Sequence, residues 1–415
     1  MEFKRDFYLK ELLRRRNSGF VKVVTGLRRC GKSYLLRTLF KRRLLAEGVP
    51  EQAIVEMAFD ERDNRQFRDP DVFYDFAKSK LKQAETVFLL DEIQFLGDFE
   101  SVLNGLLGKK ADIYVTGSNA KFLSKDVITE FRGRGDEIHL TPLSFAEYFF
   151  AFGGDRYSRF QEYMLYGGLP PVATAETAED KIAMLKSLYN ETYLRDIVGR
   201  NKIRKPAELE NLLDILSSNI GAMTNPEKLQ AIFKSVKHAA ITAATIGKYL
   251  KFLEDAYLVE AAKRYDIKGN KYIESPLKYY YSDLGLRNAR LNFRQLEESH
   301  SMENVIYTEL RRRNFNVDVG IVTVNEKNSV GNYCRKQLEV DFVANKGSKR
   351  YYIQSAYLIP DEAKREQEVR PFQKIDDSFK KVVITTLAPP PFYDDRGILT
   401  MNVFDFLLDP DSLDF

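Results

Sequence analysis

The stretch that decides the fold is Gly26-Leu27-Arg28-Arg29-Cys30-Gly31-Lys32-Ser33, with Tyr34 directly after it. It matches the pattern Gly-x-x-x-x-Gly-Lys-Ser/Thr, whose glycines let backbone N–H groups come close enough to surround a phosphate. The stretch leaves the apolar run Phe20–Thr25 and enters a segment of helical spacing, whose dipole points its positive end at the same anion. We therefore predict that residues Gly26–Tyr34 bind a nucleotide, with Lys32 at the β- and γ-phosphates and the Ser33 hydroxyl on Mg²⁺.

Around this loop, apolar runs of strand length alternate with amphipathic stretches of helix length. The runs are Phe20–Thr25, Ala53–Phe59, Thr86–Asp91, Asp112–Gly117 and Glu137–Leu140, and the stretches with helical spacing include Ser33–Ala46 and Pro70–Gln83. Such alternation predicts an α/β fold with a mostly parallel sheet that has helices on both faces. Pro142 ends this block, so we place the first domain at residues 1–143.

An acidic pair follows the third apolar run, in Val87-Phe88-Leu89-Leu90-Asp91-Glu92. A carboxylate at the end of a buried strand is costly unless it meets a cation. We predict that Asp91 holds the water shell of Mg²⁺, and that Glu92 orients and deprotonates the attacking water. This arrangement favours hydrolysis over passive nucleotide binding; the alternative is a plain Asp-Glu turn at the surface.

The next strand ends in Thr116-Gly117-Ser118-Asn119. A polar side chain at that strand tip can contact the γ-phosphate or the attacking water, because the carboxyl ends of parallel strands share one edge. We predict Ser118 and Asn119 in this role ahead of Thr116, an ordinary strand-to-helix turn being the alternative.

A short basic loop follows in Phe131-Arg132-Gly133-Arg134-Gly135. An arginine on a glycine-flanked loop is suited to contact the γ-phosphate of an adjacent subunit. We predict Arg134, ahead of Arg132, in this role, which requires a homo-oligomer; a solvated loop is the alternative.

These motifs together resemble those of the prokaryotic AAA-type (P-loop) ATPases. The likeness is to a group with Gly-x-Arg-Arg-x-Gly-Lys-Ser, Leu-Asp-Glu-Ile-Gln, Thr-Gly-Ser and Gly-Arg…Pro-Leu-Ser-Phe-x-Glu in that order, here at Gly26–Ser33, Leu90–Gln94, Thr116–Ser118, and Gly133-Arg134 leading to Pro142–Glu147. The resemblance implies a P-loop NTPase fold, ATP and Mg²⁺ as ligands, and ATPase activity. It also implies a winged helix and then a C-terminal domain of uncharacterised function that is similar to the restriction-endonuclease fold.

The rest of the chain fits three further parts. Ser144-Phe-Ala-Glu147 has the spacing of a capping box and should start a helix, and the pattern is helical to about residue 198, with an interruption at Gly167–Pro171. Three helical stretches and two strand-like runs between 205 and 285 have the layout of a winged helix. We therefore predict an ATPase core at 1–143, a helical lid or linker at 144–204, a winged helix at 205–285 and a nuclease-like domain at 286–415.

The nuclease-like domain is predicted to be inactive. Nucleases of the PD-(D/E)xK type need an Asp on one strand and Glu-x-Lys on the next, because two carboxylates hold Mg²⁺ and the Lys helps to activate water. The chain keeps Glu303 and Asp341, but it has Gln354 and Ala356 where the Glu and Lys belong. A neutral amide is a poor ligand for Mg²⁺, so we predict a degenerate site without DNA cleavage.

Composition limits the partners. The 64 Lys+Arg nearly balance the 60 Asp+Glu, so any surface that binds nucleic acid must be local. Candidate basic runs are Arg14–Arg16, Arg195–Lys205, Arg311–Arg313, and Lys248 with Lys251 on the third helix of the winged unit. Two Cys and three His form no metal or disulfide framework. No apolar run approaches 18 residues and the N-terminus is charged, so we predict a cytoplasmic protein without a membrane partner.

The sequence thus predicts Mg²⁺-dependent ATP binding and hydrolysis, coupled to the winged-helix and inactive nuclease-like modules, with DNA as one candidate partner. The alternative is a slow ATP-gated switch that recruits a protein partner and does not act on DNA. The sequence names neither that partner nor the number of subunits.

Overall fold

The computed structural model describes residues 1–81, 85–117, 135–236, 241–327 and 333–414. The chain divides into two compact units. The first contains Met1–Leu143 with two short segments, Leu169–Pro171 and Asp255–Tyr257, and the second contains the other residues. In the described part of the chain, no helix is both long enough and apolar enough to cross a lipid bilayer.

The first unit is built on a five-stranded sheet of the order β2-β3-β4-β1-β5. All its pairings are parallel, which confirms the predicted parallel α/β sheet. The strands are short, and all except β5 are mostly buried, as continuous apolar runs require. Their bounds are β1 (Val21–Thr25), β2 (Ile54–Ala58), β3 (Val87–Asp91), β4 (Asp112–Thr116) and β5 (Gly135–His139).

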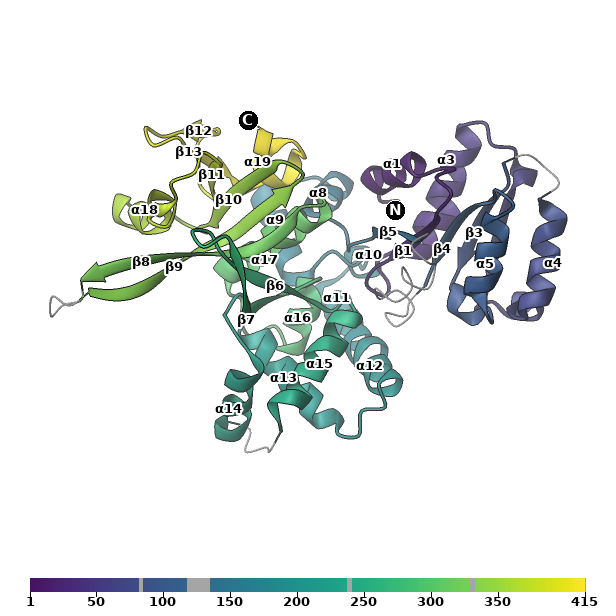
Figure 1. Cartoon of the computed structure of the whole chain (residues 1–415), viewed down its shortest axis with the longest axis horizontal. Coiled ribbons are helices and arrows are strands. Elements are labelled where there is room, and N and C mark those ends of the chain that lie inside the picture. Colours follow the sequence, from purple (N-terminus) through teal and green to yellow (C-terminus); the bar gives the residue numbers. More distant parts are fainter. Residues whose placement is uncertain (82–84, 118–134, 237–240, 328–332, 415) are drawn as a thin grey trace. The chain divides into compact units, whose positions relative to one another are not determined.

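Helices cover both faces of this sheet, as predicted. On one face, α4 (Pro70–Lys80) and α5 (Phe99–Leu107) lie side by side and share a hydrophobic cluster with alternate strand residues (Figure 1). On the other face, the ring of Tyr114 contacts Phe40 in the helix that follows the phosphate loop. That helix consists of α2 (Lys32–Tyr34), a π-helical segment (Leu35–Phe40) and α3 (Lys41–Ala46), and α1 (Asp6–Arg14) packs beside it.

The second unit begins with helices. Ser144 and Glu147 form the predicted capping box, in which each side chain accepts a hydrogen bond from the other residue's backbone N–H, and α8 starts there. In α15 the predicted core residues Ile246, Leu250 and Leu253 are buried. The helices between residues 144 and 312 are α8 (Phe145–Phe152), α9 (Arg156–Tyr166), α10 (Pro170–Ala173), α11 (Ala178–Ser187), α12 (Arg195–Arg200), α13 (Pro206–Ser218), α14 (Pro226–Val236), α15 (Ala243–Asp255), α16 (Leu284–Arg290) and α17 (Glu298–Arg312).

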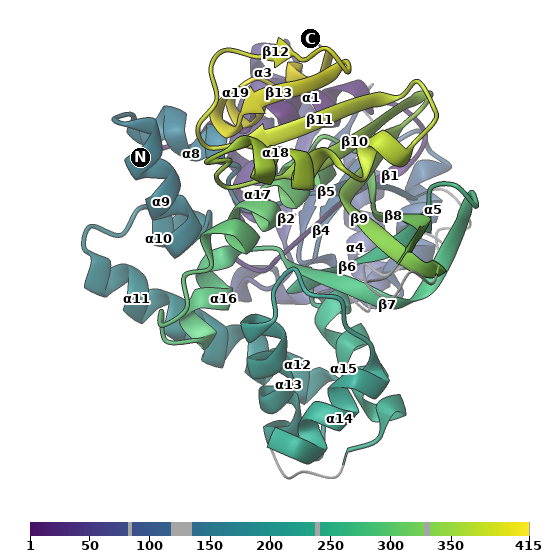
Figure 2. The same ribbon diagram turned by 90° about the vertical axis from the view of Figure 1, so that its left-hand side faces the viewer.

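A mixed eight-stranded sheet completes the second unit, in the order β12-β13-β11-β10-β9-β8-β6-β7 (Figure 2). Its strands are β6 (Val259–Asp266), β7 (Lys271–Tyr281), β8 (Asn316–Lys327), β9 (Tyr333–Lys346), β10 (Lys349–Ser355), β11 (Lys380–Thr385), β12 (Phe392–Tyr393) and β13 (Ile398–Asn402), with α18 (Glu362–Val369) and α19 (Val403–Leu408) beside them.

The ribbon β6–β7 belongs to this sheet. The two strands pair antiparallel, as expected of a ribbon, and β6 also pairs in parallel with β8, where Arg264 lies opposite Val319. The ribbon of the predicted 205–285 part and the strands of the predicted 286–415 part are therefore one sheet. The division at residue 285 stays a prediction.

Candidate functional site

The phosphate loop takes a shape that only glycine allows at one position. Gly26 has φ +134°, and a Cβ there would lie 2.1 Å from the carbonyl oxygen of Leu140. Gly31, at φ +102°, precedes α2. The Arg5 guanidinium donates to the carbonyl oxygens of Cys30 and Thr141, which ties the loop to the segment after β5. The two glycines and the Arg5 hydrogen bonds thus set the backbone geometry of the loop.

Lys32 directs its side chain into this loop. It is 6% exposed, and its Nζ lies 3.0 Å from the carbonyl oxygen of Gly26 and 3.1 Å from that of Leu27. Both acceptors are neutral carbonyl oxygens, so these contacts do not neutralise the positive charge of the ammonium. An anion that entered the loop would meet this charge directly.

Asp91 collects hydrogen bonds at the end of β3. Its Oδ1 accepts from the Ser33 hydroxyl at 3.0 Å and also from the Thr116 hydroxyl. Its Oδ2 lies 4.0 Å from a guanidinium nitrogen of Arg37. Burial raises the pKa of Asp91 above its usual value, and the hydrogen bonds from Thr116 and Ser33 oppose that shift. Three oxygen-bearing side chains from three elements thus meet beside the loop.

Glu92 follows with a left-handed backbone, at φ +52°. A non-glycine residue in this region stores strain and is typical of functional sites. Its N–H donates to the Thr116 hydroxyl at 3.2 Å, which fixes the turn to the end of β4. Its carboxylate accepts a hydrogen bond from the Gln94 amide.

The structure brings together four of the residues that the sequence assigns to the site: Lys32, Ser33, Asp91 and Glu92. The predicted residues Ser118, Asn119 and Arg134, and also Arg132, lie outside the described residues. Of the other predicted loop residues, Leu27 and Cys30 are buried, and the Tyr34 hydroxyl donates to Glu2 at 2.9 Å. Their roles in nucleotide binding stay predictions.

Sequence reasoning ranked Thr116 below its neighbours and did not include Arg37 or Gln94. Arg37 lies four residues after Ser33, one helical turn along the same face, and it also pairs with Glu56 at 2.8 Å. Helical spacing from Ser33 was therefore a signal that could have found it. Gln94 carried no such signal, because its contact with Glu92 depends on the turn between them.

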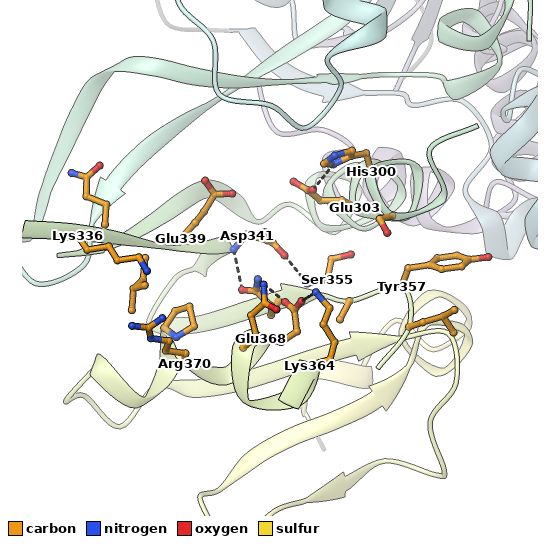
Figure 3. Close-up of a pocket in the computed structure, with 18 residues that line it drawn as sticks. His300, Glu303, Lys336, Glu339, Asp341, Ser355, Tyr357, Lys364, Glu368 and Arg370 are labelled. Atoms are coloured by element: carbon orange, nitrogen blue, oxygen red, sulfur yellow. Dashed lines mark hydrogen bonds and ion pairs between the residues drawn. The ribbon is translucent and has the colours of Figure 1, made fainter. Parts of the chain in front are cut away.

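A second polar site lies in the second unit, in a cavity of about 610 Å³ between α17, β9, β10 and α18 (Figure 3). The predicted residues Glu303 and Asp341 both line it, together with Glu339. Gln354 is also at the cavity, where its Oε1 accepts from the Asp341 N–H at 3.4 Å and its Nε2 donates to Glu368 at 3.2 Å.

Sequence reasoning missed a buried cation beside these carboxylates. Lys278 on β7 is 3% exposed, and its Nζ lies 2.8 Å from Glu303, 2.7 Å from Glu339 and 4.0 Å from Asp341. Burial alone would raise the pKa of Glu303, but the Lys278 charge and hydrogen bonds from His300, Lys278 and Tyr280 lower it to about 2. Burial and the Glu303 charge raise the pKa of Asp341 well above its usual value.

The basic run Arg311–Arg313 has partners within its own unit. Arg311 pairs with Glu260 at 2.6 Å, and the buried Arg313 binds Glu309 and the Ser412 hydroxyl. The charges that were candidates for binding nucleic acid are therefore paired within the protein. Lys248 and Lys251 are exposed on α15, so they remain the candidates on the predicted winged helix.

Comparison with known proteins matches residues 18–149 to a family described as AAA domain, and residues 157–297 to a domain of unknown function, DUF8612. An uncharacterized protein of Haemophilus influenzae is 32% identical over 97% of this chain and 98% of its own length. An uncharacterized protein of Methanocaldococcus jannaschii is 28% identical over 93% of this chain and 85% of its own length. The structure of the Aeropyrum pernix Orc1 protein in complex with DNA aligns with 70% of this chain and 93% of its own, at 12% identity and a TM-score of 0.28.

Proposed function

This chain belongs to the family of that Haemophilus influenzae protein and carries an AAA-type ATPase domain, and from this premise we propose that it binds ATP with Mg²⁺ and hydrolyses it. The observation that carries the proposal is the convergence of the Ser33 and Thr116 hydroxyls on Asp91, beside the loop that holds Lys32. Hydroxyl and carboxylate oxygens are the ligands that Mg²⁺ prefers, so these residues fit the ion.

Each residue has a definite task in this proposal. Lys32 exchanges its two carbonyl contacts for oxygens of the β- and γ-phosphates. The Ser33 hydroxyl and the Asp91 carboxylate, the latter through water, hold Mg²⁺, which when bound neutralises phosphate charge. Glu92 orients the attacking water and accepts its proton. Ser118 and Asn119 contact the γ-phosphate, and Arg134 reaches it from an adjacent subunit.

A second candidate function has its own observation. The Gln94 amide is bonded to the Glu92 carboxylate, and a base held this way is less able to take a proton from water. This contact favours a slow ATP-gated switch that recruits a protein partner through the modules after residue 143. The two functions differ in the rate of ATP turnover. They also differ in the effect expected of Glu92→Gln.

We also propose where partners bind. DNA is a candidate for the exposed Lys248 and Lys251 of α15, in keeping with a winged helix whose third helix enters the major groove. The nuclease-like part then serves as an inactive module. Completion of the nucleotide site by Arg134 requires a homo-oligomer.

The test is ATP hydrolysis by the purified full-length chain, with Mg²⁺ or EDTA, and with or without duplex and single-stranded DNA. Lys32→Ala and Glu92→Gln are compared with Lys109→Ala and Glu51→Gln, which alter exposed residues of the same unit. Turnover that needs Mg²⁺, survives in both controls and disappears in both site variants supports the ATPase. Turnover that persists in both site variants would contradict it.

The DNA arms of the same experiment separate the two functions. DNA-stimulated turnover supports action on DNA. Slow turnover that DNA does not change, with tight ATP binding retained in Glu92→Gln, supports the switch and a protein partner.

A further inference from the structure

We propose that Lys278 takes the place of a divalent metal ion in the carboxylate pocket of the second unit. The pocket of the native chain then binds neither Mg²⁺ nor Mn²⁺, and removing the Lys278 ammonium turns the same carboxylates into a divalent-cation site. This inference is independent of the ATPase, since every residue in it belongs to the second unit.

The position of the ammonium is the first argument. Lys278 Nζ touches Glu303 on α17 and Glu339 on β9, at 2.8 and 2.7 Å, and Asp341 Oδ1 lies at 4.0 Å. A hard divalent cation such as Mg²⁺ would need these oxygens at about 2.0–2.1 Å from the same point. The ammonium and the metal therefore compete for one place, and the ammonium is tethered to β7.

The remaining contacts of the carboxylates are the second argument. Glu303 Oε1 also accepts from the Tyr280 hydroxyl at 2.6 Å, and its Oε2 lies 3.4 Å from His300 Nδ1. Asp341 Oδ2 accepts from the Ser355 N–H at 2.8 Å. A metal would have to displace several of these partners together with Lys278. Among the described residues, no group of three or more His, Cys, Asp or Glu is placed to hold a metal ion as it stands, so a metal could bind here only after Lys278 is gone and these carboxylates close on the place it leaves.

Gln354 supplies the third argument. It stands where the nuclease pattern has a further carboxylate, but it is a neutral amide engaged with Asp341 and Glu368. The pocket therefore has a neutral amide in place of an anionic ligand, and a buried cation beside its carboxylates. Both features disfavour the binding of a metal ion.

The neighbours of Lys278 on β7 hold its ammonium in the place of the metal ion. The neighbouring Leu277 pairs with Thr224 through backbone hydrogen bonds of 2.8 Å in both directions, and the next-but-one residue, Tyr280, stacks on Tyr307 with ring centroids 4.1 Å apart. The ammonium thus joins the ribbon to α17 and β9. A charge that bridges three elements stabilises the pocket as a structural centre.

The test is Mn²⁺ binding to the full-length chain without nucleotide, followed by electron paramagnetic resonance of the free ion. All samples carry Asp91→Asn, so that the predicted carboxylate ligand of the first unit is absent. We compare the chain with Lys278 intact, the same chain with Asp341→Asn, Lys278→Met, Lys278→Arg, and Lys278→Met with Asp341→Asn. We expect tight Mn²⁺ binding only in Lys278→Met, and its loss on adding Asp341→Asn.

Two results would overturn the proposal. One is Mn²⁺ bound by the chain with Lys278 intact and released by Asp341→Asn. The other is a folded Lys278→Met chain that binds no more Mn²⁺ than the Lys278→Arg chain. If Lys278→Met folds poorly, thermal unfolding decides: Mn²⁺ should raise its midpoint and leave that of Lys278→Met with Asp341→Asn unchanged, and equal midpoints with and without Mn²⁺ would reject the proposal.

Discussion

Two buried lysines, one in each unit, have opposite surroundings. Lys32 is 6% exposed and Lys278 is 3% exposed, so burial does not distinguish them. Lys32 contacts two neutral backbone carbonyls, whereas Lys278 contacts the carboxylates of Glu303 and Glu339. Although burial alone would lower the pKa of Lys278, the charges of Glu303, Asp341 and Glu339 raise it.

The difference shows how partners decide what a buried lysine can do. A carbonyl holds an ammonium by a modest hydrogen bond, so a phosphate can replace it. A carboxylate fixed by the same fold holds the ammonium permanently, since separating the two would leave an unpaired charge in the interior. We infer that Lys32 is free to bind a ligand and that Lys278 is committed to structure.

The largest expected effect is on stability, through Lys278→Met. Three carboxylates lose their internal cation, and breaking a buried pair costs about 3–5 kcal/mol. Urea denaturation should show a loss of that size, while Lys268→Met, on the exposed turn of the ribbon, leaves stability unchanged. A loss below about 1 kcal/mol would remove the contrast between the two lysines, since surface pairs already reach that value.

Lys32→Ala should have a large effect on ATP turnover and a small effect on stability. Loss of a preorganised cation at the phosphates should reduce ATP turnover by about 10²–10³-fold, as for other groups that stabilise developing charge. Only two neutral hydrogen bonds are lost, so the free energy of unfolding should change by about 1 kcal/mol. Steady-state turnover and urea denaturation on one preparation check both halves, and a large stability loss would contradict the prediction.

Thr116→Val should have a smaller effect on turnover. The variant removes the hydroxyl that bonds both Asp91 and the Glu92 N–H. A hydrogen bond to a charged group contributes about 1.5–3 kcal/mol, so turnover should fall roughly 10- to 100-fold. The measurement is turnover at saturating ATP, with ATP affinity measured in parallel. Unchanged turnover would return the role to Ser118 and Asn119.

The last expected effect is a pH dependence in the carboxylate pocket. The pKa of Glu303 is lowered in the folded chain from its usual 4.5 to about 2, so its ionised form stabilises the fold above pH 4.5. That contribution is lost as the pH falls towards 2. The gap in unfolding free energy between the unaltered chain and Glu303→Gln should therefore shrink between pH 4.5 and 2 in urea titrations. A gap independent of pH would argue against the Lys278–Glu303 pairing.

Much of the first unit could be predicted from the sequence. Continuous apolar runs predict buried parallel strands, and the spacing of Gly26, Gly31, Lys32 and Ser33 predicts the phosphate loop. Asp91 was found because a carboxylate directly after such a run meets the loop at the same edge of the sheet. The bond between Thr116 and Asp91 could not be predicted, because the sequence shows that strand tips meet, but not which of four consecutive residues faces Asp91. The ranking of Ser118 and Asn119 ahead of Thr116 stays a prediction, since both lie outside the described residues.

The second unit was harder to predict, for a physical reason. Alternation along β6 and β7 shows which side of a ribbon is apolar, but not which strand it pairs with. The parallel pairing of β6 with β8 joins Arg264 to Val319, across residues that include two helices. Lys278 stands directly before three tyrosines, and no sequence pattern assigned it a role. Its contact with Glu303 appears only when that pairing is known.

The pairing of β6 with β8 has a consequence for inheritance. A recombination event that replaced residues 205–285 by another segment would leave β8 with an open edge, which invites aggregation. The same event would remove Lys278 and leave Glu303, Glu339 and Asp341 without their cation. The ribbon and the carboxylates therefore depend on each other, and we expect homologues without Lys278 to carry an acidic residue at position 354.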